Sequence, residues 1–149
     1  MDLKETIRSI SDWPIKGVIF RDLTTLMQDP DAFRESCDIL YNRYKEMGID
    51  KIVGIDARGF VFGAVLAYKM GIGFVPVRKK GKLPCKTIQE TYNLEYGTDT
   101  LEIHEDAILK GEKVVIVDDL IATGGTVGAT VKLVEKLGAN LIECAFVVE

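Results

Sequence analysis

The residues that decide the fold are Val114-Val115-Ile116-Val117-Asp118-Asp119-Leu120-Ile121-Ala122-Thr123-Gly124-Gly125-Thr126. The first four form a continuous apolar run, which is typical of a strand buried on both faces of a sheet. Two acids follow, and a turn of small residues then leads into a predicted helix over 125–137. A buried strand that passes through a short turn into a helix indicates an α/β protein.

The same alternation of strands and helices extends through most of the chain. Asp29 is a suitable N-cap and Pro30 a suitable first helical residue, so a helix is predicted from there to about Gly48. Apolar runs and helical spacing predict strands at 52–55, 73–77 and 141–148 and a helix over 60–70. We therefore expect a parallel sheet with helices on both faces and ligands beyond the carboxyl ends of its strands.

The stretch from Arg78 to Leu109 is different, because it is polar and interrupted by glycines. Its alternation is weak, so it is interpreted as either a hairpin or a long mobile loop over the core. It opens with the basic run Arg78-Lys79-Lys80-Gly81-Lys82, which in most proteins would be a solvated loop. No linker or repeat interrupts the chain, and 149 residues fit a single domain.

Composition limits the possible functions. Hydrophobic residues make up 47% and charged residues 28% of the chain, and the formal net charge of -4 argues against a general nucleic-acid binder. The 3 cysteines are widely spaced and form no metal-ligand pattern. No apolar run approaches the roughly 20 residues that a transmembrane helix needs. We expect a soluble, cytoplasmic protein that binds neither nucleic acid nor membranes.

The turn after the two acids has the chemistry of a phosphate site. Gly124 and Gly125 allow the backbone to come close to a ligand, and Thr123 and Thr126 supply hydroxyl donors at a helix N-terminus. Asp118 and Asp119 would repel a phosphate unless the ligand also carries a diol or a divalent cation. A sugar phosphate satisfies both parts of the segment.

Other phosphate motifs fit poorly. The stretch Gly54-Ile55-Asp56-Ala57-Arg58-Gly59 has the glycine spacing of a P-loop, but Phe60 stands where the lysine belongs. No GxGxxG follows a predicted strand, so a dinucleotide site is not expected.

The segment 114–126 resembles the phosphoribosyl-diphosphate motif of the type I phosphoribosyltransferase family. Four further stretches are similar to the adenine-specific branch of that family, in the same order along the chain: 17–23, 56–60, 78–84 and 92–97. The resemblance implies transfer of a phosphoribosyl group from phosphoribosyl diphosphate to adenine, with Mg²⁺, in a homodimer. It also implies an N-terminal hood over 1–28 that binds the base, and a mobile catalytic loop region over 78–109.

The resemblance also implies roles for individual residues. Mg²⁺ would be held through substrate and water, and a cis peptide bond would join Asp56 to Ala57. Departure of diphosphate leaves positive charge on the sugar, so basic groups and a proton-accepting carboxylate are the expected catalytic parts. The implied residues are Ala122, Thr123, Gly124, Gly125 and Thr126 for the 5-phosphate; Asp118 and Asp119 for the ribose; Arg58, Lys79 and Lys82 for the diphosphate; Ile19, Phe20 and Arg21 for the base; and Glu95, Arg58 and Tyr96 for catalysis.

Two departures from the family leave the choice of base open. Relatives usually have Pro-Gly where this chain has Lys16-Gly17, and they continue past the final strand with residues that close the base pocket. The alternatives are therefore a phosphoribosyltransferase for another purine, such as xanthine or guanine, or a non-catalytic sensor of phosphoribosyl diphosphate. A sensor would be expected to carry a nucleic-acid-binding element and could lose Glu95.

Overall fold

The computed structural model describes residues 3–6, 8–11, 19–94, 96–120 and 125–148. The chain divides into two units, 1–42 and 43–149, and each is described by itself. The first unit contains the short 3₁₀ helix η1 (Leu3–Thr6), the antiparallel strands β1 (Arg8–Ser11) and β2 (Ile19–Asp22), the helix α1 (Thr24–Gln28) and most of α2 (Pro30–Tyr44).

The predicted start of α2 is confirmed by its N-cap. The Asp29 carboxylate accepts hydrogen bonds from the backbone N–H groups of Asp31 at 3.0 Å and Ala32 at 3.3 Å. These bonds satisfy amides that have no partner inside the helix. The helix ends at Tyr44 rather than near Gly48, and Gly48 instead takes a left-handed conformation in the turn that follows.

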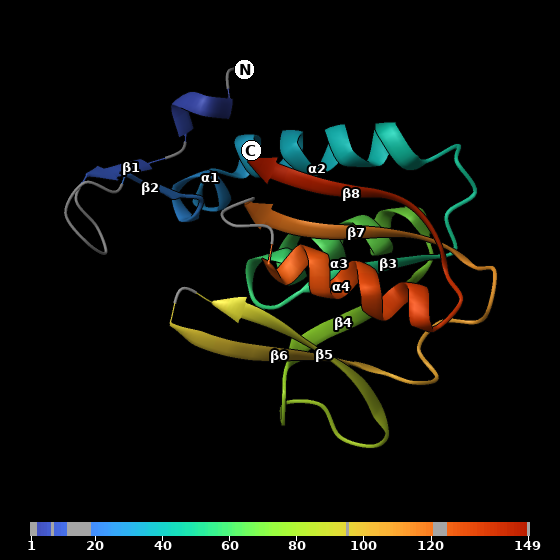
Figure 1. The fold of residues 1–149 in the computed structure, drawn as a ribbon. Helices are drawn as coiled ribbons and strands as arrows, with labels where there is room; N and C mark the ends of the chain where they lie inside the picture. The colour runs from blue at the N-terminus through green and yellow to red at the C-terminus, as the bar shows by residue number, and fades with distance from the viewer. Residues whose placement is uncertain (1–2, 7, 12–18, 95, 121–124, 149) are drawn as a thin grey trace. The chain divides into compact units, whose positions relative to one another are not determined.

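The second unit is built on a sheet with the strand order β5-β6-β4-β3-β7-β8 among the described residues (Figure 1). The strands β4, β3, β7 and β8 run parallel, whereas β6 pairs with β4, and β5 with β6, in antiparallel fashion. The bounds of the strands are Lys51–Ile55 for β3, Gly73–Lys79 for β4, Thr87–Leu94 for β5, Gly97–His104 for β6, Lys113–Leu120 for β7 and Asn140–Val148 for β8. The predicted parallel sheet is thus extended by an antiparallel hairpin.

The helices α3 (Arg58–Met70) and α4 (Gly125–Lys136) cover opposite faces of this sheet (Figure 1). Successive residues of a strand point to opposite faces. Val53 and Ile55 accordingly pack in the core with Leu133 of α4. On the other face, Gly54 leaves room for the ring of Phe74, which also lies against α3. The prediction of helices on both faces is confirmed for this unit.

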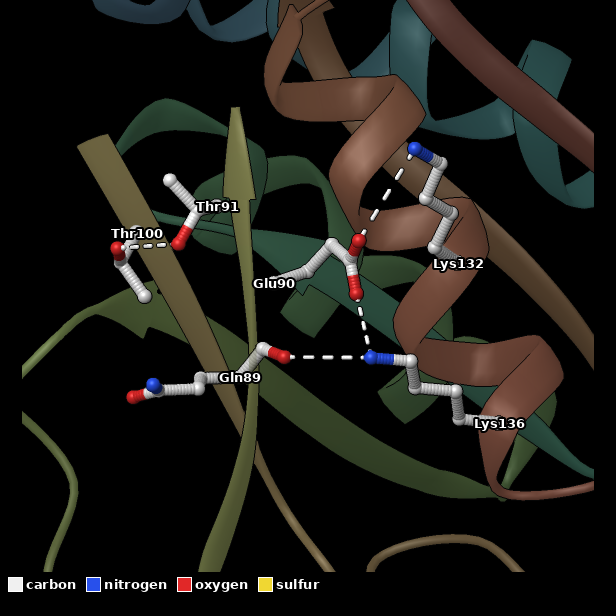
Figure 2. Close-up of polar contacts among 6 residues, drawn as sticks. All are labelled: Gln89, Glu90, Thr91, Thr100, Lys132 and Lys136. Carbon is white, nitrogen blue, oxygen red and sulfur yellow. Dashed lines mark hydrogen bonds and ion pairs between the residues drawn. The ribbon is translucent and has the colours of Figure 1, made fainter. Parts of the chain in front are cut away.

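The hairpin interpretation of the polar stretch is confirmed, and the hairpin is part of the sheet rather than a loop above it. Leu101 and Ile103 of β6 are buried in the core. On β5, Glu90 lies between two lysines of α4, with Oε2 at 2.5 Å from Lys136 Nζ and Oε1 at 4.0 Å from Lys132 Nζ (Figure 2). The hairpin is therefore held to the helix that begins at the predicted phosphate turn.

Candidate functional site

The two predicted acids lie at the carboxyl end of β7. The strand continues through them, because Asp118 and Leu120 pair with Phe146 and Val148 of the parallel strand β8. Asp118 and Asp119 are both buried, and the Asp119 N–H donates to Asp118 Oδ1 at 2.8 Å. Two adjacent carboxylates are thus fixed on the last residues of a central strand.

Burial changes the protonation of this pair. Removal from water, together with the neighbouring Asp119, raises the pKa of Asp118 to about 7. The charged form of a carboxylate is disfavoured in a poorly solvated site, and a second acid adds to that effect. Asp118 can therefore exchange a proton near neutral pH when a ligand with hydroxyl groups or a cation arrives.

Arg58 faces the acids from the first residue of α3. Its Nε lies 2.7 Å from Asp119 Oδ2, and the arginine side chain is 36% exposed. The contact is an ion pair without hydrogen-bond geometry, because Asp119 Oδ2 is buried and accepts no hydrogen bond from any residue that the structure describes. The guanidinium thus occupies this buried oxygen electrostatically, and a ligand hydroxyl or a hydrated cation would have to compete with Arg58 for it.

Gly59 makes this approach possible. A Cβ built at position 59 would lie 2.8 Å from the carbonyl oxygen of Val117 and 3.2 Å from both the Cα and the Oδ1 of Asp118. Only a residue without a side chain lets the start of α3 come so close to β7. The glycine therefore sets the position of Arg58 relative to the acids.

The turn between β3 and α3 contacts the end of the neighbouring strand β4. The peptide bond between Asp56 and Ala57 is cis, as the resemblance implied. The Asp56 N–H donates to the carbonyl of Val77 at 3.0 Å, and its carboxylate lies 3.0 Å from Arg78 Nε. Sequence reasoning missed this pair, because nothing local indicates which acid an exposed arginine will meet.

The two lysines predicted to bind diphosphate are both exposed, at the end of β4 and in the turn that follows. Lys79 Nζ lies 3.2 Å from Asp99 Oδ2 on β6, and this hydrogen-bonded acid raises the pKa of Lys79 above its usual range. The carbonyl of Lys82 accepts a hydrogen bond from Arg78 Nη1 at 3.4 Å. Like Asp56, Asp99 was not singled out by sequence reasoning, because its contact with Lys79 depends on strand pairing.

The predicted phosphate turn is described only at its helical end. Gly125 and Thr126 form the first turn of α4, and the carbonyl of Thr126 accepts a hydrogen bond from the Thr130 hydroxyl at 2.7 Å. Ala122, Thr123, Gly124 and Glu95 lie outside the described residues. Tyr96 is described and is 90% exposed at the start of the turn into β6.

The residues predicted to bind the base lie in the first unit. Ile19, Phe20 and Arg21 belong to β2 and pair with Ser11, Ile10 and Ser9 of β1. The Lys16-Gly17 departure lies outside the described residues. The role of β2 in binding a base stays a prediction.

The carboxylates of Asp118 and Asp119 are also possible neighbours of a metal ion. Within the described ranges, no group of three or more His, Cys, Asp and Glu side chains is arranged to hold a metal. Asp118 and Asp119 nevertheless offer the carboxylate oxygens that Mg²⁺ prefers, and Asp119 Oδ2 accepts no hydrogen bond from a described residue. Two carboxylates are too few to hold a metal ion by themselves, but their oxygens could accept hydrogen bonds from a hydrated Mg²⁺. None of the described helices combines the length and apolarity needed to cross a membrane.

Comparison with known proteins gives a consistent result. The family model for the phosphoribosyl transferase domain matches residues 22–149. The chain is 68% identical over 149 residues to an adenine phosphoribosyltransferase of Desulfosudis oleivorans, which covers 100% of this chain and 86% of the relative. An Escherichia coli protein of the same name is 59% identical over 146 residues, covering 98% and 80%.

Solved structures that resemble this chain carry the same name as the relatives found by sequence. The adenine phosphoribosyltransferase of Saccharomyces cerevisiae, complexed with an imino-altritol bisphosphate and adenine, matches with a TM-score of 0.94 at 45% identity and covers 99% of this chain and 86% of its own. The enzyme of the same name from Thermoanaerobacter pseudethanolicus matches with a TM-score of 0.92 at 52% identity, covering 97% and 84%.

Proposed function

The chain belongs to the phosphoribosyl transferase family, and we propose that it performs the adenine reaction of its relatives with the site at the carboxyl end of β7. The reaction transfers the 5-phosphoribosyl group from phosphoribosyl diphosphate to adenine and gives AMP and diphosphate. A nitrogen of the base forms a bond to the anomeric carbon of the ribose, and the bond from that carbon to diphosphate breaks.

One observation carries the assignment of the site to these residues. The buried acids Asp118 and Asp119 and the partly exposed Arg58 lie together at the carboxyl end of β7, shortly before the start of α4. Acids suit the ribose hydroxyls, a cation suits the diphosphate, and a helix N-terminus suits the 5-phosphate. Phosphoribosyl diphosphate carries these three groups on one sugar, whereas a simple phosphate ester carries only one of them.

We assign the binding roles on this basis. The 5-phosphate would be held by the turn 122–126 and the ribose hydroxyls by Asp118 and Asp119. The diphosphate would be held by Arg58, Lys79 and Lys82, which offset the negative charge that grows as it leaves. The opposite charge develops on the sugar, where the acid pair is suitably placed to stabilise it.

The remaining roles rest on the resemblance. Glu95 would accept the proton that the purine nitrogen loses, with Tyr96 beside it, and the hairpin turn would exclude water from the reacting carbon. Ile19 and Arg21 would bind adenine through backbone groups, with the ring of Phe20 against the base.

We include Mg²⁺ as the cofactor, held through oxygens of the substrate and water, with Asp118 and Asp119 near enough to accept hydrogen bonds from its water shell. When bound, it would supply positive charge to the diphosphate leaving group. Support comes from the oxygen chemistry of the acid pair and from the buried Asp119 Oδ2 that no described residue hydrogen-bonds.

We further propose that the enzyme is a cytoplasmic homodimer. The described cysteines Cys37, Cys85 and Cys144 are free thiols, which fits a reducing compartment. On α3, the exposed apolar side chains of Val61 and Tyr68 are of the kind that a second copy would cover.

The function is tested by supplying the purified protein with phosphoribosyl diphosphate, Mg²⁺ and one purine base at a time. We expect AMP from adenine, identified by chromatography, and far less product from guanine, xanthine or hypoxanthine. Faster turnover of one of those bases would reassign the substrate. Binding of phosphoribosyl diphosphate without turnover of any base would instead make the chain a sensor.

A further inference from the structure

A buried acid, Glu102, lies beneath the basic turn formed by residues 79–82. This turn follows β4 and is tied to β6 through its backbone: the Lys80 N–H donates to the carbonyl of Thr100 at 3.0 Å. Gly81 stands at its centre with φ +87°, a left-handed conformation. The side chains of Lys79, Lys80 and Lys82 are exposed, so the turn presents its cations to solvent.

Glu102 holds the inner side of this turn. The side chain is buried on β6, and its Oε1 accepts a hydrogen bond from the Gly81 N–H at 2.6 Å. Its Oε2 accepts a hydrogen bond from the hydroxyl of Thr87, the first residue of β5. These two bonds hold the pKa of Glu102 below its usual range, so the carboxylate stays charged at neutral pH.

The neighbours of Glu102 connect the turn to the core. Leu101 and Ile103, on either side of it, are buried in the hydrophobic core of the second unit. The core contacts of Leu101 and Ile103 hold β6 in place. Through its hydrogen bond to Gly81, Glu102 ties the exposed turn 79–82 to this strand. A buried charge whose hydrogen bonds come from two neutral donors contributes little to stability, because such a charge is expensive to remove from water. We therefore look for the role of the Glu102 carboxylate in the conformation of the turn 79–82.

We propose that Glu102 is a positioning residue for diphosphate binding, which acts by fixing Gly81 and thereby the orientation of Lys79 and Lys82. The inference rests on the role proposed above for those two lysines. Through its bond to the same carboxylate, Thr87 belongs to this positioning device. Neither Glu102 nor Thr87 needs to touch the substrate, and both would act through the shape of the turn.

The test compares Thr87→Val, which removes the hydroxyl at nearly constant volume, with Thr87→Ser, which keeps it. Glu102→Gln serves as a second variant, because its amide oxygen cannot replace both charged acceptors. The measurements are the affinities for inorganic diphosphate with Mg²⁺ and for AMP, obtained by titration calorimetry, with the thermal midpoint as a check on folding. AMP contains the ribose 5-phosphate and the base but no diphosphate.

We expect Thr87→Val and Glu102→Gln to weaken diphosphate binding by about tenfold, because a hydrogen bond to a charged group is lost. AMP affinity should be unchanged, and Thr87→Ser should behave like the parent protein. The proposal would be overturned if Thr87→Val and Glu102→Gln weakened diphosphate and AMP binding equally. It would also be overturned if neither of these two variants weakened diphosphate binding.

A Lys79→Ala, Lys82→Ala double variant separates this result from the assignment of the lysines themselves. Weakened diphosphate binding in the lysine variant, with normal binding in Glu102→Gln and Thr87→Val, leaves the lysines assigned and removes only the positioning role. Normal diphosphate binding in the lysine variant overturns the assignment of the lysines, and the positioning role with it.

Discussion

Replacing Gly59 by alanine should move the start of α3 away from the acids of β7. The added methyl carbon would lie 2.8 Å from the carbonyl oxygen of Val117, and 3.2 Å from the Cα of Asp118. The nearest atom belongs to the backbone of a central strand, so it cannot give way as the end of a flexible side chain could. The strain has to be relieved by shifting α3, and Arg58 shifts with it.

The magnitude follows from two opposing effects. Overpacking of a well-packed site costs about 1–3 kcal/mol. The change from glycine to alanine within a helix, taken alone, stabilises by roughly 0.5–1 kcal/mol. Gly128 of α4 isolates the second effect, because a Cβ there would meet nothing within 4 Å and its φ is not positive. Because the helix gain is common to both variants, we expect Gly59→Ala to be less stable than Gly128→Ala by the overpacking cost alone, about 1–3 kcal/mol in the free energy of unfolding.

Urea denaturation of the parent protein and the two variants measures this difference, and steady-state kinetics show its effect on the site. We expect Gly59→Ala to raise KM for phosphoribosyl diphosphate by about tenfold, or about 1.4 kcal/mol, because Arg58 and Asp119 no longer meet as they do in the parent protein. The reasoning fails if Gly59→Ala is as stable as Gly128→Ala and retains the parent KM.

Three further changes test the charges of the site. Burial raises the pKa of Asp118 from 3.8 to about 7, so folding favours the protonated form, and this contribution to stability is lost progressively as the pH rises from about 4 to about 7. Asp118→Asn should therefore gain stability relative to the parent protein over that range in thermal melts, and a constant difference would contradict this. Arg58→Ala should weaken diphosphate binding in calorimetry more than AMP binding; equal losses would make Arg58 a structural residue. Asp99→Asn should tighten diphosphate binding up to about fivefold, because it releases Lys79 from an exposed ion pair worth under ~1 kcal/mol; weaker binding would show that Asp99 orients the lysine instead.

The parts of the fold that sequence could predict are those specified by neighbouring residues. The apolar run of β7 predicts a doubly buried strand, and Asp29 with Pro30 predicts the start of α2, because both depend on a few adjacent side chains. The ligand site at the carboxyl end of β7 is also predictable, because two acids are followed directly by glycines and threonines in the sequence. The cis bond at Asp56 was implied by family resemblance and not by any local pattern.

What sequence could not predict depends on pairing between distant segments. The hairpin of β5 and β6 alternates only weakly, and it becomes part of the sheet because Arg78 and Lys79 of β4 pair with Glu102 and Leu101 of β6. Asp99 and Glu102 gain their partners through this pairing, and Asp56 gains Arg78 through the parallel pairing of β3 with β4. One signal was available for Glu102, since an acid between two apolar residues of an interior strand is expected to have a specific partner.

The arrangement of charges separates fixed acids from cations that can change partners. In the described part of the site, Arg58, Arg78 and Lys79 each pair with an acid, and their side chains are 36%, 35% and 66% exposed. The pairs of Arg78 and Lys79 are largely exposed and contribute little, so a bound diphosphate can compete for these two cations at a small loss of stability, whereas release of Arg58 would leave the buried Asp119 without its cation. The partner acids are less exposed, at 11%, 30% and 27%, and remain anchored on the sheet and its turns. The proposed diphosphate site thus holds its cations on anchored acids, and its exposed pairs are weak enough for an anionic ligand to displace the acids.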